Sequence, residues 1–158
     1  MNITVISVGK IKEKYFTAAI DEYSKRLSRF AKLNIIEVAD EKIPDNASEK
    51  EMEQIKEKEG NKILVKLPQN SFVVTLCIEG KEHSSEELAK KIADISMTSS
   101  HITFIIGGSL GLSDTVKSKS ALRLSFGKMT LPHQLMRVVL LEQIYRAFKI
   151  NNNESYHK

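Results

Sequence analysis

The chain has 158 residues, 41% of them hydrophobic and 28% charged, which is typical of one globular domain with a buried core. The single cysteine, Cys77, excludes an internal disulfide, and its place in an apolar run favours a core position over a nucleophile. Residues 1–10 lack the basic leader of a secretion signal. No apolar run approaches the roughly 18 residues of a membrane-spanning helix. We therefore expect one cytoplasmic domain over residues 1–158.

Positive charge is concentrated towards the two ends of the chain. Residues 10–32 carry seven basic and three acidic side chains, and residues 121–158 carry six and two. Residues 37–59 reverse the balance, with nine acidic side chains and four lysines. Two basic ends fit a polyanionic partner such as a nucleic acid, and they fit solvated helix faces equally well. Charge alone leaves the partner open.

Apolar periodicity predicts alternating strands and helices from the start of the chain. A strand at 3–8 is followed by an amphipathic helix at 13–29, a second strand at 33–39 and a loop at 40–47. A capping box at Ser48 and Glu51 starts a charged helix, which Pro68 limits to about residue 67. An almost continuously apolar strand follows at 71–78, and we expect Gly80 to turn the chain.

The second half of the chain continues this alternation. A second capping box, formed by Ser84 and Glu87, starts a helix that ends near residue 96. An apolar strand at 102–106 then runs into a glycine-rich turn. A short helix at 113–118, a strand at 122–125 and a closing helix at about 132–148 complete the pattern. The alternation predicts an α/β fold in which helices cover a parallel sheet.

Three loops of the predicted sheet are candidates for a ligand site. Open parallel sheets bind their ligands beyond the carboxyl ends of the strands. This rule selects the loops that follow Leu76, Ile106 and Ser125.

The glycine-rich turn at 107–111 can bring backbone close to a ligand, because glycine adopts positive φ without strain. It lacks the lysine and hydroxyl residues of a Walker loop, and Ser109 and Leu112 stand where a dinucleotide fingerprint has glycines. A ligand-binding turn and a tight turn without a ligand are equally open readings. The four histidines show no metal-ligand spacing, so we expect no metal site.

The closing helix is apolar around nearly its whole circumference between Leu135 and Phe148. Such a helix is buried on every side, which in a small chain indicates the interface of a symmetric dimer. A central helix within the monomer is the alternative. Arg137 lies in this apolar run and needs a partner, which makes it a candidate for the site or the interface.

Five sequence motifs, spread over the full length, together resemble the SPOUT methyltransferases. Among them, the chain is similar to the small enzymes that methylate N3 of a pseudouridine in 23S ribosomal RNA. The motifs are the opening strand with Gly9-Lys10, the turn Ile106-Gly107-Gly108-Ser109-Leu110-Gly111, the segment 125–134, the helix segment 137–147 and the final Tyr156-His157-Lys158.

The resemblance implies a cofactor, S-adenosylmethionine, and a homodimer. It also implies a deep trefoil knot in the C-terminal part, one of the rare exceptions to unknotted topology, with the cofactor bound in the knot and the dimer formed through it. Carried over residue by residue, the expected cofactor contacts come from the three selected loops: Leu76, Gly107, Phe126, Gly127, Lys128, Met129, Thr130 and Leu131.

The implied substrate is 23S rRNA in the assembled 70S ribosome, because a small dimer has little room for a separate RNA-binding domain. The N3 proton must be removed, or the developing anion must be stabilised. The candidate catalytic residues are His133, Arg137, Tyr156 and His157. We expect Arg137 to stabilise charge, His133 or His157 to accept the proton, and the C-terminal tail to enter the partner's cofactor pocket.

The sequence departs from the family pattern at two places. Asn152-Asn153 replace an Arg-Gly pair, which weakens an RNA contact but preserves the turn, because Asn tolerates left-handed backbone. Leu110 replaces a residue that is polar in many relatives.

Two alternative functions stay open. One is a non-catalytic ribosome- or RNA-binding protein that retains the fold, and the other is an α/β enzyme with another adenosine-containing cofactor. The intact segment 126–130 argues against both.

Overall fold

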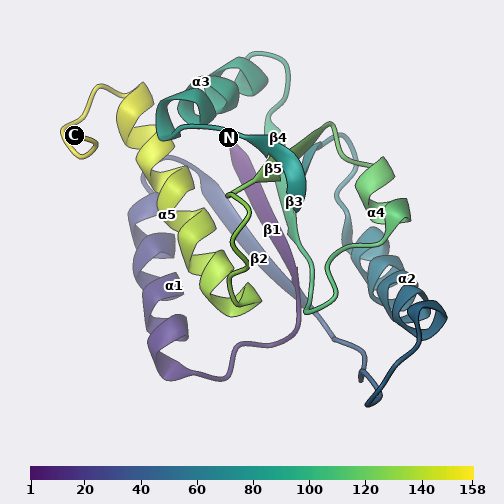
Figure 1. Cartoon of the computed structure of the whole chain (residues 1–158). Helices are drawn as coiled ribbons and strands as arrows, with labels where there is room; N and C mark the ends of the chain where they lie inside the picture. The colour runs from purple at the N-terminus through teal and green to yellow at the C-terminus, as the bar shows by residue number, and fades with distance from the viewer.

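A computed structural model describes all 158 residues. Strands and helices alternate in the predicted order (Figure 1). The elements are β1 (Asn2–Val8), α1 (Lys14–Leu27), β2 (Lys32–Val38), α2 (Glu49–Lys66), β3 (Phe72–Glu82), α3 (Ser85–Ser96), β4 (His101–Ile106), α4 (Asp114–Ser118), β5 (Leu122–Ser125) and α5 (His133–Asn151). Both predicted capping boxes are present, at the starts of α2 and α3.

The five strands form one parallel sheet in the order β2-β1-β4-β3-β5. This confirms the predicted α/β fold with a parallel sheet. Strands β1 and β4 lie at its centre, which explains their almost wholly buried sequences. All carboxyl ends of a parallel sheet lie at one edge, so the loops after β3, β4 and β5 are brought together there.

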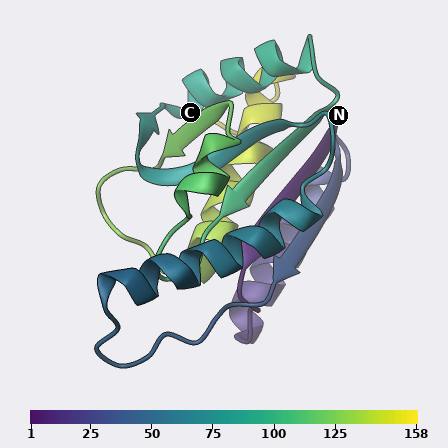
Figure 2. The ribbon, with the colours of Figure 1, turned by 90° about the vertical axis from the view of Figure 1, so that its right-hand side faces the viewer.

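Helices cover both faces of the sheet. On one face, α1, α3 and α5 pack on residues such as Ile3, Val5 and Phe104. On the other face, α2 and α4 pack on Ile6 and Val8, which point the opposite way along β1. In Figure 2, α2 lies in front of the sheet and α5 behind it. No helix combines the length and the apolar character that a membrane crossing requires.

Strand β3 differs from the prediction, because it continues to Glu82 and Gly80 does not turn the chain. The pairing of β3 with β5 is interrupted after Leu76 and resumes at Lys81. Within this irregularity, a Cβ on Gly80 would lie 2.6 Å from the carbonyl oxygen of Arg123. Gly80 therefore permits close contact between two strand backbones, which sequence alone does not distinguish from a turn.

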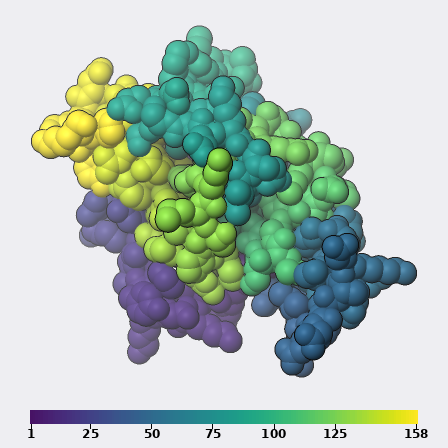
Figure 3. Space-filling model, in the orientation of Figure 1, coloured from purple at the N-terminus to yellow at the C-terminus, as the bar shows by residue number.

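The chain returns from the sheet edge to its centre after β5. Residues 126–132, here called the 126–132 loop, lead from edge strand β5 to α5, which packs between α1 and α3. In Figure 3 this loop lies on the molecular surface beside α5. Along α5, only one stripe is fully buried: Arg137, Leu140, Leu141, Ile144 and Ala147. The other side chains from His133 to Ile150 are half-buried, so one chain alone does not cover this helix completely.

Candidate functional site

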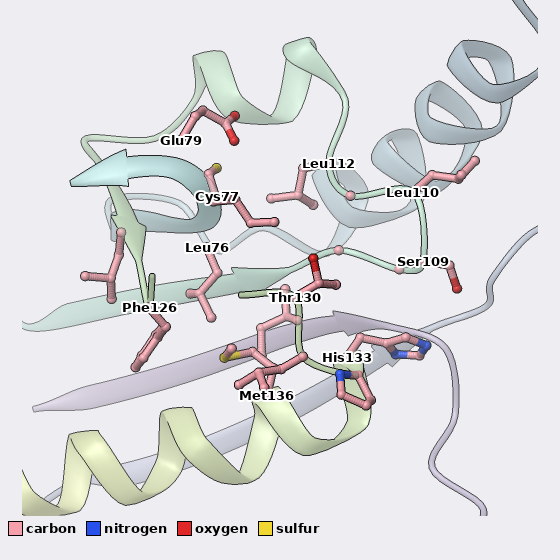
Figure 4. Close-up of a pocket in the computed structure, with 18 of the residues that line it drawn as sticks. Leu76, Cys77, Glu79, Ser109, Leu110, Leu112, Phe126, Thr130, His133 and Met136 are labelled. Atoms are coloured by element: carbon pink, nitrogen blue, oxygen red, sulfur yellow. The ribbon is translucent and has the colours of Figure 1, made fainter. Parts of the chain in front are cut away.

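A cavity of about 720 Å³ opens at the carboxyl ends of β3, β4 and β5. Figure 4 shows residues of β3, the glycine turn, the 126–132 loop and α5 arranged around the same space. The cavity is lined by both apolar and charged residues: Lys56, Leu76, Cys77, Ile78, Glu79, Ile106, Gly107, Gly108, Ser109, Leu110, Gly111, Leu112, Lys117, Leu124, Phe126, Gly127, Met129, Thr130, Leu131, Pro132, His133 and Met136.

The glycine turn at 107–111 is closed by its own backbone. The amide of Gly111 donates to the carbonyl of Gly108 at 3.0 Å, and Gly111 has a φ of +84°. A Cβ on Gly107 would lie 2.7 Å from the carbonyl carbon of Gly111. The turn thus needs its glycines for its own geometry, and it also presents bare backbone to the cavity.

The 126–132 loop begins at a second fixed turn. Ser125 donates from Oγ to the carbonyl of Ile78 at 2.9 Å, and its Oγ accepts the amide of Gly127 at 3.1 Å. Gly127 has a φ of +115°, and a Cβ there would meet no atom within 4 Å. Beyond this anchored turn, Met129 is 86% exposed. A rigid base with exposed apolar side chains therefore forms one wall of the cavity.

Seven of the eight expected cofactor residues line this cavity. They are Leu76, Gly107, Phe126, Gly127, Met129, Thr130 and Leu131. Lys128 is exposed and is not among the lining residues. The three loops selected by the parallel-sheet rule thus come together.

Sequence reasoning missed a charged pair at the cavity. Lys117 of α4 donates to Glu79 of β3 at 2.6 Å. The hydrogen bond from Lys117 lowers the pKa of Glu79, and the same bond raises the pKa of Lys117. No local signal reveals this pair, because its members are 38 residues apart and meet only through the irregular end of β3.

Cys77 also lines the cavity, but its thiol is unsuited to nucleophilic attack. Its side chain is buried, and burial is the main cause that raises the pKa of the thiol. Its Sγ lies 3.5 Å from Oγ1 of Thr75, to which it donates. The expected core role agrees with this environment. No group of three or more His, Cys, Asp or Glu side chains is arranged to hold a metal ion.

His133 lies at the start of α5 and lines the cavity. Burial lowers the pKa of its imidazole, and the positive charge of Arg137 lowers it further. Its Nδ1 is buried without a hydrogen-bond partner. The ring is therefore neutral near pH 7 and has one nitrogen lone pair that can accept a proton.

Arg137 lies one turn further along α5 and holds the helix to the sheet. Its side chain is 3% exposed, and Nη1 donates to Oε2 of Glu37 at 2.6 Å. Nη2 donates to the carbonyls of Val8 and Gly9, at 2.9 and 2.7 Å. The amide of Ile11 donates to the same glutamate oxygen at 3.0 Å. Arg137 therefore joins α5 to β1 and β2, and it is not among the cavity-lining residues.

Tyr156 and His157 lie beyond the opposite end of α5. Residues 155–158, here called the tail, fold back onto α5 and α3 in the same chain. The Tyr156 hydroxyl donates to Glu142 at 2.6 Å, and His157 contacts Glu86 at 2.7 Å. An intact 19-residue helix separates this tail from His133. One chain thus brings His133 to its cavity but not Tyr156 or His157.

The reversal that leads into the tail has the conformation expected from Asn152-Asn153. Asn153 has a φ of +54°, and the amide of Glu154 donates to the carbonyl of Lys149 at 3.0 Å. Asparagine therefore supports the left-handed turn that closes α5.

Comparison with known proteins defines the class of protein. The family model described as "Predicted SPOUT methyltransferase" matches residues 1–157, and the chain belongs to this family. Two relatives named ribosomal RNA large subunit methyltransferase H are similar over all of both chains. They come from Clostridium botulinum strain Kyoto, at 63% identity, and Clostridioides difficile strain 630, at 60%.

Solved structures show the same fold at low sequence identity. A probable methylase family protein from Haemophilus influenzae matches 99% of this chain and 70% of its own, with a TM-score of 0.55 and 14% identity. A methyltransferase structure from Legionella pneumophila, in complex with bound SAM, matches 94% of this chain and 66% of its own. Its TM-score is 0.53 and its identity is 14%.

Proposed function

We propose that this protein transfers a methyl group from S-adenosylmethionine to N3 of a pseudouridine in 23S ribosomal RNA, acting in the cytoplasm on the assembled 70S ribosome. The observation that carries the proposal is the cavity where seven of the eight expected cofactor residues meet. Full-length relatives at 60–63% identity bear the name of a large-subunit rRNA methyltransferase, which supports the ribosomal substrate.

The cavity residues fit S-adenosylmethionine in size and chemistry. A volume of about 720 Å³ lies within the range of small-molecule sites. Leu76, Phe126 and Met136 offer apolar surface, and the two glycine-containing turns offer backbone amides and carbonyls at close range. The bound cofactor supplies an electrophilic methyl group on its sulfonium. The chain's own task is to hold the acceptor base in line with that group.

We assign the proton-accepting role to His133 first. The acceptor N3 carries a proton at neutral pH, so a neutral base at the cavity assists the reaction. His133 meets this requirement because burial and the Arg137 charge keep its imidazole unprotonated. Arg137 uses its guanidinium on Glu37 and two backbone carbonyls. We therefore assign Arg137 the positioning of His133 and α5, and not direct charge stabilisation on the substrate.

We propose a homodimer in which the tail of each chain completes the partner's cavity. The half-buried side of α5 supports a subunit interface, since apolar side chains such as Leu135, Val138 and Val139 are incompletely covered there. The tail lies at the far end of α5 from its own cavity, so it serves a cavity only across such an interface. The chain's return from β5 to the centre of the sheet supports the deep trefoil knot expected for the family.

RNA binding is assigned to the basic segment after β1. Lys10, Lys12 and Lys14 are exposed, and they follow Gly9, whose added Cβ would lie 3.4 Å from the His133 ring. Positive charge thus stands at the same edge of the sheet as the cavity. Contacts of this kind to phosphates give an affinity that falls steeply with salt.

The test is methyl transfer to ribosomes from a strain that lacks this modification. Tritiated S-adenosylmethionine is supplied with 70S ribosomes, separated 50S subunits or naked 23S rRNA, and label is mapped by nuclease digestion and mass spectrometry. We expect label on one pseudouridine, and only with 70S ribosomes. Label on another nucleotide would contradict the acceptor, equal labelling of naked RNA would contradict the 70S requirement, and no label without cofactor binding would contradict the enzyme.

A further inference from the structure

The tail is held to its own chain by a connected set of polar side chains. Glu142 is central to this set: Oε2 accepts the Tyr156 hydroxyl at 2.6 Å, and Oε1 accepts Nε of Arg146 at 2.7 Å. Nη1 of Arg146 in turn lies 3.1 Å from Nδ1 of His157. Nε2 of His157 lies 2.7 Å from Oε1 of Glu86 on α3. Two carboxylates thus define the orientation of two tail side chains.

Donor and acceptor chemistry fixes the direction of each contact. A guanidinium only donates, so Nδ1 of His157 must accept from Arg146. The ring proton of neutral His157 is then on Nε2, which donates to Glu86. The hydrogen bond to Glu142 is the largest cause that raises the pKa of Tyr156 to about 12, so its hydroxyl stays protonated and donates. The arrangement selects one tautomer of His157 and one orientation of Tyr156.

Packing restrains the tail as well. The guanidinium of Arg146 lies 4.7 Å from the centre of the Tyr156 ring, in a cation–π contact. The ring of Tyr145 meets the same tyrosine edge-on at 5.0 Å. Chain termini are ordinarily mobile unless they are tied down. A restrained tail loses less conformational freedom when it enters a site, which lowers the entropic cost of assembling that site.

We propose that Glu142 is a positioning residue for methyl transfer, which presents Tyr156 and, through Arg146, His157 to the partner's cavity. Glu142 itself touches neither cofactor nor RNA. This inference rests on the proposed function, because it assigns a purpose to the tail in that reaction. It differs from a purely structural role, since Glu142 joins only the tail and α5 and holds no part of the cavity.

Three variants separate the contacts of Glu142. Glu142→Ala removes both acceptors. Glu142→Gln keeps one carbonyl oxygen, which can accept from Arg146 Nε, while its NH₂ group can only donate, so the Tyr156 hydroxyl must turn from donor to acceptor and the carboxylate charge is lost. Tyr156→Phe removes the hydroxyl alone. The matched control is Asp94→Ala, which breaks an exposed i,i+4 pair with Lys90 on α3, away from the tail.

Three measurements are made on each full-length variant. Steady-state methylation of 70S ribosomes gives kcat and KM, and calorimetry gives the affinity for S-adenosylmethionine. Carboxypeptidase trimming of the C-terminus, followed by mass spectrometry, reports release of the tail without any reference to activity. We expect Glu142→Ala to trim faster than wild type and to lose about tenfold to a hundredfold in kcat, the loss typical of a misplaced catalytic group. The trimming rate and the kcat of Glu142→Gln should both lie between those of wild type and those of Glu142→Ala.

Cofactor affinity should stay within about twofold in all these variants, because none of the residues expected to hold the cofactor is changed. Tyr156→Phe combined with Glu142→Ala should be no worse than Glu142→Ala alone if the two act as one unit. Faster trimming with unchanged kcat would overturn the positioning role, and unchanged trimming would overturn the tail attachment. A loss of cofactor affinity parallel to kcat would show a general structural effect. An inactive wild type would instead refute the proposed function, independently of the trimming result.

Discussion

The two ends of α5 each carry an arginine paired with a glutamate, but the two pairs join different parts of the molecule. Arg137 is 3% exposed and reaches Glu37, 100 residues away in sequence. Arg146 is 24% exposed and pairs with Glu142, one turn away on the same helix. The first pair joins a helix to two strands, whereas the second organises only the tail. Residues that hold α5 against the sheet beside the cavity are thus distinct from residues that hold the tail, which we propose enters the partner's cavity.

The largest effect is expected from Arg137→Met. This change leaves the carbonyls of Val8 and Gly9 without their donor, and it leaves Glu37 without its cation. Breaking a buried pair from one side costs about 3–5 kcal/mol, and we expect a loss near the lower value because Glu37 is 37% exposed. Urea denaturation measures it. Lys90→Met, which breaks an exposed pair, should cost no more than about 1 kcal/mol, and equal losses would remove the distinction between the two kinds of pair.

Deletion of residues 155–158 tests the other end of α5. Turnover on 70S ribosomes should fall about a hundredfold, in the range of a lost acid–base group. Cofactor affinity should change by less than about twofold, because the residues expected to hold the cofactor lie in the three loops and not in the tail. Single-turnover kinetics with calorimetry measure both. Full activity of the shortened chain would exclude the tail from the reaction.

Gly127→Ala should weaken cofactor binding by about tenfold, which corresponds to about 1.4 kcal/mol. A φ of +115° is strained for alanine, so the start of the 126–132 loop must shift. Calorimetry with S-adenosylmethionine measures the change. Asn153→Ala also alters a residue with positive φ, but it lies at the tail end of α5 and should leave affinity unchanged. An equal loss in both variants would mean that the two ends are not independent.

The smallest effect is expected from the pH dependence of stability through His133. Its pKa is lowered from 6.5 in the folded chain, so the unfolded chain binds more protons as the pH falls through about 6.5. Stability from neutral His133 is therefore present above that pH and decreases below it. Urea denaturation between pH 8 and pH 5.5 should show a steeper decrease for wild type than for His133→Gln. Parallel profiles would contradict a neutral, half-buried imidazole at His133.

Local patterns were sufficient to predict most of the fold. Capping residues at Ser48 and Ser84 and the apolar periodicity located helices and strands, because both signals depend on near neighbours. The position of the cavity followed from the rule for parallel sheets, since that rule needs only the direction of the strands. The residues expected to hold the cofactor came from the family resemblance, and seven of them line the cavity.

Contacts between distant residues could not be predicted from the sequence. The apolar run around Arg137 indicated that it needs a partner, but nothing local identified Glu37. The continuation of β3 past Gly80 depends on the neighbouring backbone of Arg123, which lies 43 positions later in the printed chain. Attachment of the tail depends on Glu86 of α3. The homodimer, the knot and the 70S substrate stay proposals.

The pairing of Glu37 with Arg137 also bears on when the enzyme becomes competent during its own synthesis. Residues 2–38 supply β1, α1 and β2 early, but the carboxyl ends of β1 and β2 are joined to α5 only after residue 137 has been made. Contacts across such long separations form late and slowly. A nascent chain therefore carries no finished cavity until the start of α5 has been made and has packed against β1 and β2.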